Sequence, residues 1–346
     1  MIKKINIYRR NSTKFLTQKL GQNSYINVET NQIEKVLVIR PNHRLGNILL
    51  ITPLIEEVIH HFPNAKIDLF VKGKISEIIF EKHSKIDMIL ALPKNHFKEL
   101  LAYISIWFKI LTKRYDLVIN ANSISSSGQI AAKLARGKFK FFGEEKENKY
   151  EQLTDYYHFA KFGVYNFRAY LSKSWPNLVF DEIPKLHLTL SEQEIEKGQE
   201  IINAITKNNK KTIAFFTYAT GDKCYSKEFW AEMYSKMQVA FGKDYNLIEI
   251  LPVENVSQID FIAPNFYSKD IREIAAVLKN TELFLGADSG MMHLATTNTT
   301  TFGLFSKTPT EKYQPFGQFN MGINMNDTSI DNCILLLENY LKQKNN

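Results

Sequence analysis

The sequence predicts an α/β protein of two consecutive domains, each a doubly wound parallel sheet with helices on both faces. Uninterrupted apolar runs of strand length alternate with segments of helical period, and this alternation occurs twice, before and after an irregular region at 144–182. The 346 residues suffice for two domains that each bury a core. Two such domains are expected to face a cleft, with ligands at the carboxyl ends of the strands.

The first series begins with a strand at 35–40. A loop at 41–46 leads into a helix in which Thr52 is the expected N-cap and Pro53 lies in the first turn, where proline is tolerated. Residues 62–64 end this helix. The following elements are strands at 65–71, 86–92 and 115–120, a helix at 97–111, and helices plus a connection at 144–182, with Trp175 and Pro176 near the domain boundary.

The second series begins at Ser191, where the spacing to Glu194 predicts a capping box at a helix start. Strands are predicted at 211–217, 245–251, 282–286 and 301–305, the last of which ends the series, and helices at 227–239 and 270–278.

The chain carries a net charge of +8, so we expect an anionic partner, although charge alone does not choose among nucleic acid, lipid and phosphorylated substrate. Residues 1–20 hold six basic side chains and no acid, with apolar residues between them. This segment is either a basic leader lying on an anionic membrane surface or a solvated tail.

Cysteine usage and hydropathy favour a cytoplasmic protein. Cys224 and Cys333 lie far apart and outside any CxxC pattern, which argues against a disulfide framework or a zinc site. No apolar segment like that of a signal peptide follows the early lysines. The longest apolar stretch, at 100–111, is shorter than the roughly 20 residues that span a bilayer.

The most informative segment is 283–295, where a buried strand is followed by Asp288, Ser289 and Gly290 and then by a short helix. Unpaired N–H groups at such a helix start, with the positive end of the helix dipole, suit a diphosphate. The alternative is that Asp288 or Ser289 merely caps the helix. His293 taken alone is more typical of a buried histidine of the core than of a ligand-binding residue.

This segment resembles the donor-binding motif of glycosyltransferase family 9, the ADP-heptose:lipopolysaccharide heptosyltransferases. The family pattern Gly-x-Asp-[Ser/Thr]-Gly-x-x-His-[Leu/Ile]-Ala is filled at 286–295. Residues 302–317 resemble the strand and Pro-Thr loop that follow in the family. Residues 38–53 and 62–65 are similar to its opening strand, Gly-Asp loop and first helix, and 217–230 to its phosphate-binding loop. The matches run in order over 36–320, with poor agreement between about 75 and 185.

The resemblance implies a GT-B architecture and inverting transfer without a metal or other cofactor. It implies an acceptor-binding domain at 35–182 and a nucleotide-sugar-binding domain at 183–346, and residues 1–34, ahead of them, are the predicted basic leader. The sequence also lacks an Asp-x-Asp pair for a divalent ion. Helix-start amides and Lys223, unless it is an ordinary loop lysine, would then neutralise the leaving diphosphate. The implied donor residues are Asp288, Ser289, Gly290, Met291, His293 and Lys223 for the diphosphate and Glu254 for the ribose, and the acceptor residues are Arg40, Arg44 and Gly46.

One position departs from the family. Where its Gly-Asp loop supplies an acidic base, this chain has Asn47, whose carboxamide takes no proton at neutral pH. His43, whose ordinary pKa suits a base, is one substitute, and the acceptor's own phosphate or another carboxylate is a second. The third account is that the protein binds without transferring.

The sequence therefore predicts a metal-independent glycosyltransferase of lipopolysaccharide or related surface-glycan assembly. The expected partners are a nucleotide-diphosphate sugar, ADP-heptose favoured, and an anionic glycolipid, with the protein cytoplasmic or peripheral on the cytoplasmic face of the inner membrane. The rival hypothesis is a non-catalytic binding module of the same fold, motivated by Asn47. A nucleic-acid partner is not expected, because only the charge supports it. An NAD-dependent dehydrogenase is disfavoured because no GxGxxG follows a predicted strand.

Overall fold

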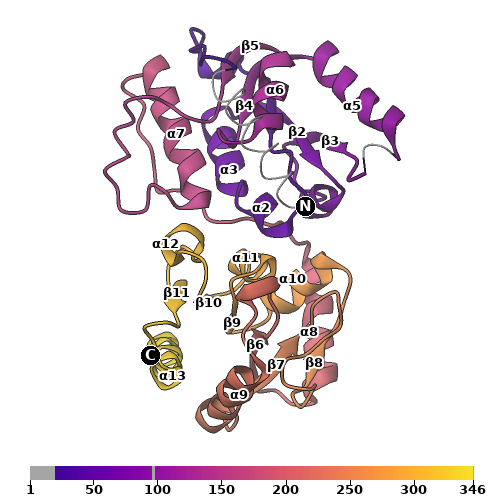
Figure 1. Ribbon diagram of the computed structural model, residues 1–346, viewed down its shortest axis with the longest axis vertical. Helices are drawn as coiled ribbons and strands as arrows, with labels where there is room; N and C mark the ends of the chain where they lie inside the picture. The colour runs from indigo at the N-terminus through magenta and orange to yellow at the C-terminus, as the bar shows by residue number, and fades with distance from the viewer. Residues whose placement is uncertain (1–19, 96–97, 346) are drawn as a thin grey trace, which may run out of the picture. The chain divides into compact units, whose positions relative to one another are not determined.

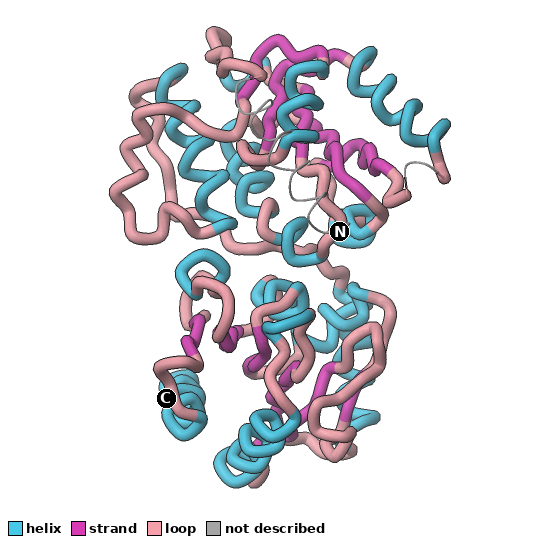
Figure 2. Tube along the Cα trace, in the orientation of Figure 1, coloured by secondary structure: helices cyan, strands magenta, loops and turns pink. Residues whose placement is uncertain are grey.

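The computed structural model describes residues 20–95 and 98–345, and the chain divides into two compact units between Pro184 and Lys185 (Figure 1). The boundary lies two residues beyond the predicted one. Each unit is a parallel sheet flanked by helices, as the tube view makes plain (Figure 2). The prediction of a doubly wound α/β fold is thus confirmed for both units.

The first unit contains a five-stranded sheet in the order β3-β2-β1-β4-β5, with every neighbouring pair parallel. Its strands are β1 (Lys35–Ile39), β2 (Lys66–Lys72), β3 (Ile86–Leu92), β4 (Arg114–Asn120) and β5 (Arg136–Phe141). Its helices are η1 (Thr30–Gln32), α2 (Leu45–Leu49), α3 (Thr52–His61), α4 (Ile75–Ile79), α5 (Leu100–Thr112), α6 (Ser126–Leu134) and α7 (Phe159–Ser174). Helices α5 and α6 share a core with β1 and β4, and α3 packs against α7 on the other side of the sheet.

The second unit contains a six-stranded sheet in the order β11-β10-β9-β6-β7-β8, again all parallel. Its strands are β6 (Lys211–Phe216), β7 (Tyr245–Ile250), β8 (Asn265–Phe266), β9 (Leu283–Ala287), β10 (Thr301–Phe305) and β11 (Met321–Asn324). Its helices are α8 (Glu192–Thr206), η2 (Gly221–Lys223), α9 (Lys227–Phe241), α10 (Ile271–Lys279), α11 (Gly290–Thr296), α12 (Thr310–Tyr313) and α13 (Ile330–Asn345). Helices α9 and α13 share one core cluster, and α8 packs against α10.

Two local predictions are wrong. The strand at 301–305 does not end the series, because β11 pairs with it and α13 follows. Thr52 does not cap α3: Ile51 holds the N-cap position, and the Thr52 hydroxyl instead donates to the Leu49 carbonyl. Pro53 does lie in the first turn, as its missing N–H favours.

The segment 20–34, part of the predicted leader, packs onto the first unit. Ser24 forms an isolated bridge with Lys140, and Ile26 and Ile33 are buried. The Tyr170 hydroxyl of α7 donates to the Ser24 carbonyl at 2.7 Å. The predicted basic segment at 1–20 lies, except for Leu20, outside the described residues.

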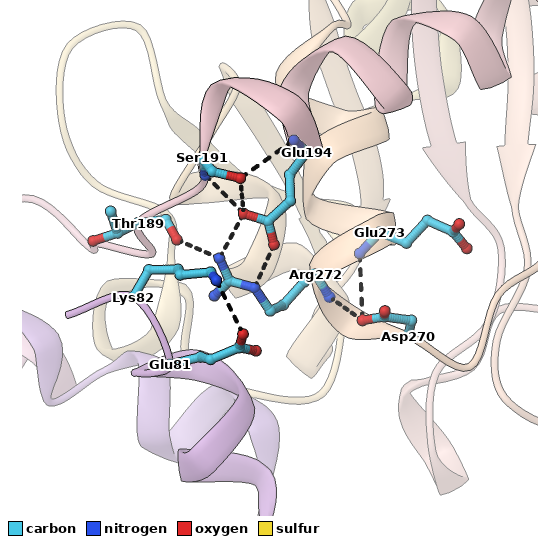
Figure 3. Close-up of polar contacts among 8 residues, drawn as sticks. All are labelled: Glu81, Lys82, Thr189, Ser191, Glu194, Asp270, Arg272 and Glu273. Carbon is cyan, nitrogen blue, oxygen red and sulfur yellow. Dashed lines mark hydrogen bonds and ion pairs between the residues drawn. The ribbon is translucent and has the colours of Figure 1, made fainter.

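Within the described part of each unit, a buried arginine binds a glutamate with two nitrogens. In the first unit Arg168 of α7 donates to both carboxylate oxygens of Glu57 at 2.6 and 2.8 Å. In the second unit Arg272 of α10 donates to both oxygens of Glu194 at 2.6 and 2.9 Å (Figure 3). Glu194 also accepts from the Ser191 backbone N–H, and the Ser191 hydroxyl accepts from that of Glu194, so the predicted capping box is confirmed.

Candidate functional site

The donor-type motif lies at the carboxyl end of β9, in the centre of the second sheet. Asp288 follows β9, is only 5% exposed, and is held by its backbone N–H, which donates to the Leu304 carbonyl of β10. Its carboxylate accepts from the Lys223 ammonium at 3.2 Å and from the Thr308 hydroxyl at 2.6 Å. Asp288 therefore ties together the segments that follow β6, β9 and β10.

The capping function falls to Ser289. It adopts an extended conformation at the N-cap of α11, and its hydroxyl accepts from the Met292 N–H at 3.3 Å. Ser289, Gly290 and Met291 are partly exposed, so solvent or a ligand can reach the helix start. His293 lies one turn further along and is 4% exposed, which places it within the packed part of the helix.

Lys223 is the cation of this cluster. It ends η2, the short helix in the segment between β6 and α9, and its side chain is 32% exposed. Since its ammonium has three donors and Asp288 uses one, it can bind a further anion without leaving Asp288. The cluster therefore offers a positive group beside a solvent-accessible helix start.

A second polar network underlies the neighbouring loop and was missed by sequence reasoning. Glu249, near the end of β7, is fully buried and accepts from the hydroxyls of Thr217 at 2.6 Å and Ser257 at 2.7 Å. Burial raises the pKa of Glu249, and the two hydroxyl hydrogen bonds offset this only in part. An acid inside the apolar run 245–251 was the available signal, because a buried carboxyl requires partners.

This network connects two loops at the same edge of the sheet. Thr217 follows β6, on the segment that carries Lys223, whereas Ser257 follows β7, three residues after Glu254. The Thr217 hydroxyl also accepts from the Gln258 N–H at 3.1 Å. Glu254 itself is exposed on the loop that the network holds.

The residues predicted to lie on the acceptor side gather at the carboxyl end of β1 in the first unit. Asn47 on α2 donates to the Asn42 side-chain oxygen at 3.2 Å, and its own oxygen accepts from Arg40 at 3.5 Å, the long end of the hydrogen-bonding range. The Arg44 N–H also donates to Asn42, at 2.9 Å. Gly46 is buried in the first turn of α2. The carboxamide of Asn47 is thus used at both ends.

His43 stands on the same loop and is exposed. Partial burial lowers the pKa of His43 first, and the positive charges of Lys94, Lys72 and Arg44 lower it further. The imidazole is therefore neutral at pH 7 and able to accept a proton. The structure places Arg40 and His43 on the loop after β1 and Asn47 on the short helix that follows it, whereas Lys223, Asp288 and Ser289 meet in the other unit.

Among the described residues no group of three or more His, Cys, Asp or Glu side chains is arranged to hold a metal ion. Cys224 and Cys333 are free thiols. Over the same residues, no helix has both the length and the apolar character that crossing a bilayer requires.

A family model described as "Glycosyltransferase family 9 (heptosyltransferase)" matches residues 261–334, the part of the chain that contains Asp288, Ser289 and Thr308. The predicted resemblance to glycosyltransferase family 9 is confirmed. The match supports a glycosyltransferase as the kind of enzyme, while the comparison with curated protein sequences finds no significant match.

Solved structures show the same fold at low sequence identity. A family 9 glycosyltransferase from Veillonella parvula is 16% identical with a TM-score of 0.67, over 87% of this chain and 89% of the other. Escherichia coli heptosyltransferase WaaC with ADP is 14% identical with a TM-score of 0.65, over 88% and 99%. The E. coli ADP-heptose lipopolysaccharide heptosyltransferase II is 15% identical with a TM-score of 0.63, over 90% and 100%. The chain thus has the α/β fold of GT-B glycosyltransferases.

Proposed function

We propose that this glycosyltransferase moves a sugar, heptose favoured, from a nucleotide-diphosphate donor to a lipopolysaccharide-type or related surface-glycan acceptor, with inversion at the transferred carbon. The observation that carries the proposal is the Lys223–Asp288–Thr308 cluster beside the start of α11. The similar E. coli structures include one with ADP and one with ADP-2-deoxy-2-fluoro heptose, which favours ADP-heptose as the donor. The protein would act in the cytoplasm, or peripherally at the cytoplasmic face of the inner membrane.

The donor's diphosphate would bind across the helix start at Ser289–Met291. As the bond from the sugar to the diphosphate breaks, negative charge grows on the leaving phosphate oxygens. The Lys223 ammonium and the N–H groups at the start of α11 would stabilise that charge, and Asp288 and Thr308 would hold the lysine and its loop in place. Glu254 would bind the ribose from the loop that Glu249 supports.

The acceptor hydroxyl would be deprotonated by His43. Its lowered pKa leaves it neutral at pH 7, while Asn47, already hydrogen-bonded to Asn42 and Arg40, would orient the acceptor through its amide. Arg40 and Arg44 would contact anionic groups of the glycolipid, with Gly46 allowing close approach at the loop.

The donor site is tested by measuring binding and transfer with ADP-, GDP- and UDP-sugars. We expect Lys223→Ala to reduce turnover by roughly 10- to 100-fold, because a charge-assisted hydrogen bond made in the transition state is lost. Lys227→Ala is the matched control, since Lys227 is an exposed lysine of the same region that pairs with Asp260. Full activity of Lys223→Ala would refute the phosphate role. Gly290→Val should abolish nucleotide binding by crowding the helix start, and unchanged calorimetric affinity would refute the assignment of that site.

The base is tested by His43→Gln, which should lower the rate by about 10²–10⁴-fold, with the exposed His60→Gln as the control. The rate of the parent enzyme should fall as the pH is lowered, because His43 becomes protonated. This fall should occur below the ordinary histidine pKa of about 6.5, since the pKa of His43 is lowered. Asn47→Ala should reduce activity, and Asn47→Asp should retain or raise it.

The rival function is a binding module, and the carboxamide at position 47 is the observation in its favour. Tight nucleotide-sugar binding by the parent, with no transfer to any acceptor tested, would establish that alternative.

A further inference from the structure

Helix α5 exposes an unusual amount of apolar surface. Its exposed side chains include Leu101 at 85%, Phe108 at 64% and Leu100 at 55%, with Ile104 at 54% and Leu111 at 39%. A lone exposed leucine is ordinary on a protein surface, whereas five large apolar side chains on a 13-residue helix are not.

These side chains lie on one face. With about 100° between successive residues of an α-helix, Leu100, Ile104, Phe108 and Leu111 fall within one quarter of the helix circumference, and Leu101 borders them. The adjoining part of the circumference carries Tyr103, Ile106, Trp107 and Ile110, which pack into the core shared with β3, β5 and α6. The helix therefore has one apolar face inside the unit and a second one facing outward.

The charged residues on α5 and on the segment before it are mostly basic. Lys94, Lys98 and Lys109 are exposed before or on the helix, and Glu99 is the acid among them. Lys113 adds little charge, since its ammonium lies 2.7 Å from Asp68 and 3.6 Å from Asp87.

A basic hollow of about 580 Å³ begins where α5 ends. It lies at the amino ends of β1 and β4 and along β5, and its cationic lining is Lys35, Arg114, Arg136, Lys138 and Lys140. Two acids, Glu34 and Asp116, also line it, and Asp116 is occupied by the backbone N–H groups of Glu34 and Lys35. The hollow therefore keeps an excess of positive charge, and Arg114 in its lining follows the last residue of α5 by two positions.

We propose that the outer face of α5 and this basic hollow form a docking surface for an anionic lipid bilayer. The apolar side chains would enter the boundary between headgroups and acyl chains, while the surrounding cations contact lipid phosphates. Charge complementarity selects this occupant. A second copy would set the same basic surface against itself, and residues 1–19, with six basic side chains and no acid, would be repelled in the same way. The inference concerns where the enzyme sits, and it stands apart from the sugar that the enzyme transfers.

The test is sedimentation of the full-length protein with phosphatidylglycerol-containing vesicles, in the absence of substrates, so that its outcome does not depend on the proposed reaction. We expect Leu101→Glu with Phe108→Glu to weaken binding more than about tenfold, because two apolar anchors become anions. Val239→Glu is the control, since Val239 is 86% exposed on α9 of the other unit. Arg114→Glu with Arg136→Glu should weaken binding to anionic vesicles, and salt should weaken it in the parent.

A fluorescent variant separates the possible occupants. Phe108→Trp should show a blue shift and quenching by brominated lipids when vesicles are added, whereas Val239→Trp should show neither. Unchanged vesicle binding of the double glutamate variant would overturn the proposal. So would a blue shift without vesicles, which would mean a second copy if it grows with protein concentration and residues 1–19 if it disappears when they are deleted.

Discussion

The two units use the same device to hold a glutamate, but they bury it to different depths. Glu57 lies inside α3, 2% exposed, and accepts from Arg168 and from His61 at 3.1 Å. Glu194 lies at the start of α8, with a side chain 25% exposed, and accepts from Arg272 and from its capping partner Ser191. The first pair is enclosed by the unit, whereas the second is attached to a helix end that water reaches.

The difference appears in the pKa values. Burial alone would raise the pKa of Glu57, yet hydrogen bonds from His61 and Arg168 outweigh it and hold that pKa below the ordinary value. Hydrogen bonds from Arg272 lower the pKa of Glu194 to about 2, and burial opposes them less. In the deep pair the hydrogen bonds must first offset a dominant desolvation penalty, whereas in the shallow pair the Arg272 hydrogen bond outweighs that penalty.

The largest effect is expected from Arg168→Met, which would leave the Glu57 carboxylate buried with only His61 beside it. Breaking a buried pair costs about 3–5 kcal/mol in the free energy of unfolding. Urea unfolding measures this loss of stability, and hydrogen exchange of peptides from α3 and α7 assigns it to the first unit. A double variant, Arg168→Met with Glu57→Gln, should recover part of the loss, and a loss below about 1 kcal/mol in the single variant would show that water already reaches Glu57.

A smaller loss is expected from Arg272→Met, about 1.5–3 kcal/mol, because Glu194 keeps its bonds from Ser191 and is reached by solvent. Hydrogen exchange of α8 and α10 reports this change in the second unit. If the two arginine variants lose the same stability, the depth of burial does not govern the strength of these pairs.

The stabilising contribution of the Arg272–Glu194 pair should be lost over a defined range of acidic pH. The folded-state pKa of Glu194 is about 2, below its unfolded value of about 4.3, so its contribution is complete above pH 4.3 and is lost as the pH falls toward 2. We expect the stability of the second unit to decrease over that range in the parent and to change less in Arg272→Met. Parallel pH profiles for the two proteins would contradict this assignment.

The smallest effect should come from Glu249, a buried carboxyl with hydroxyl partners and no arginine. Its pKa is raised, so the folded state is favoured when this group is protonated and is penalised as the pH rises through its folded-state pKa. Glu249→Gln removes the penalty while keeping a hydrogen-bonding group at Ser257, and we expect a gain of about 0.5–1.5 kcal/mol at pH 8 that shrinks at pH 5. Thermal melts at both pH values check it, and Glu249→Ala, which loses both hydroxyl partners, should be destabilised at both.

Local signals predicted the fold well where neighbours in sequence decide it. The Ser191–Glu194 capping box depends on residues three apart, and β1, β6 and β9 are apolar runs whose burial on both faces the sequence already requires. Strand β5 was missed because Arg136–Phe141 alternates charged and apolar residues at the edge of the sheet, and the apolar-run criterion does not detect such a strand.

The candidate site was predictable only as a set of positions. The segment 286–295 identified Asp288 and Ser289, but which of the two caps the helix depends on contacts made across the sheet. Asp288 pairs with Lys223, 65 residues earlier, and with Thr308, 20 residues later, which leaves Ser289 alone to cap α11. Arg272 and Glu194, 78 residues apart, lay beyond any local pattern for the same reason.

Both arginines also hold the chain on either side of the boundary between the units. Arg168 donates to the carbonyls of Asp181 and Glu182, and Arg272 donates to that of Thr189. Each unit thus holds the part of the connecting segment next to it through hydrogen bonds from its buried arginine. For anyone dividing the gene to produce the units separately, a first fragment must run through Glu182 and a second must begin before Thr189. Lys185 is exposed and lies between these limits, so trypsin should cleave the chain after it. Both arginines would keep their hydrogen bonds in the two fragments.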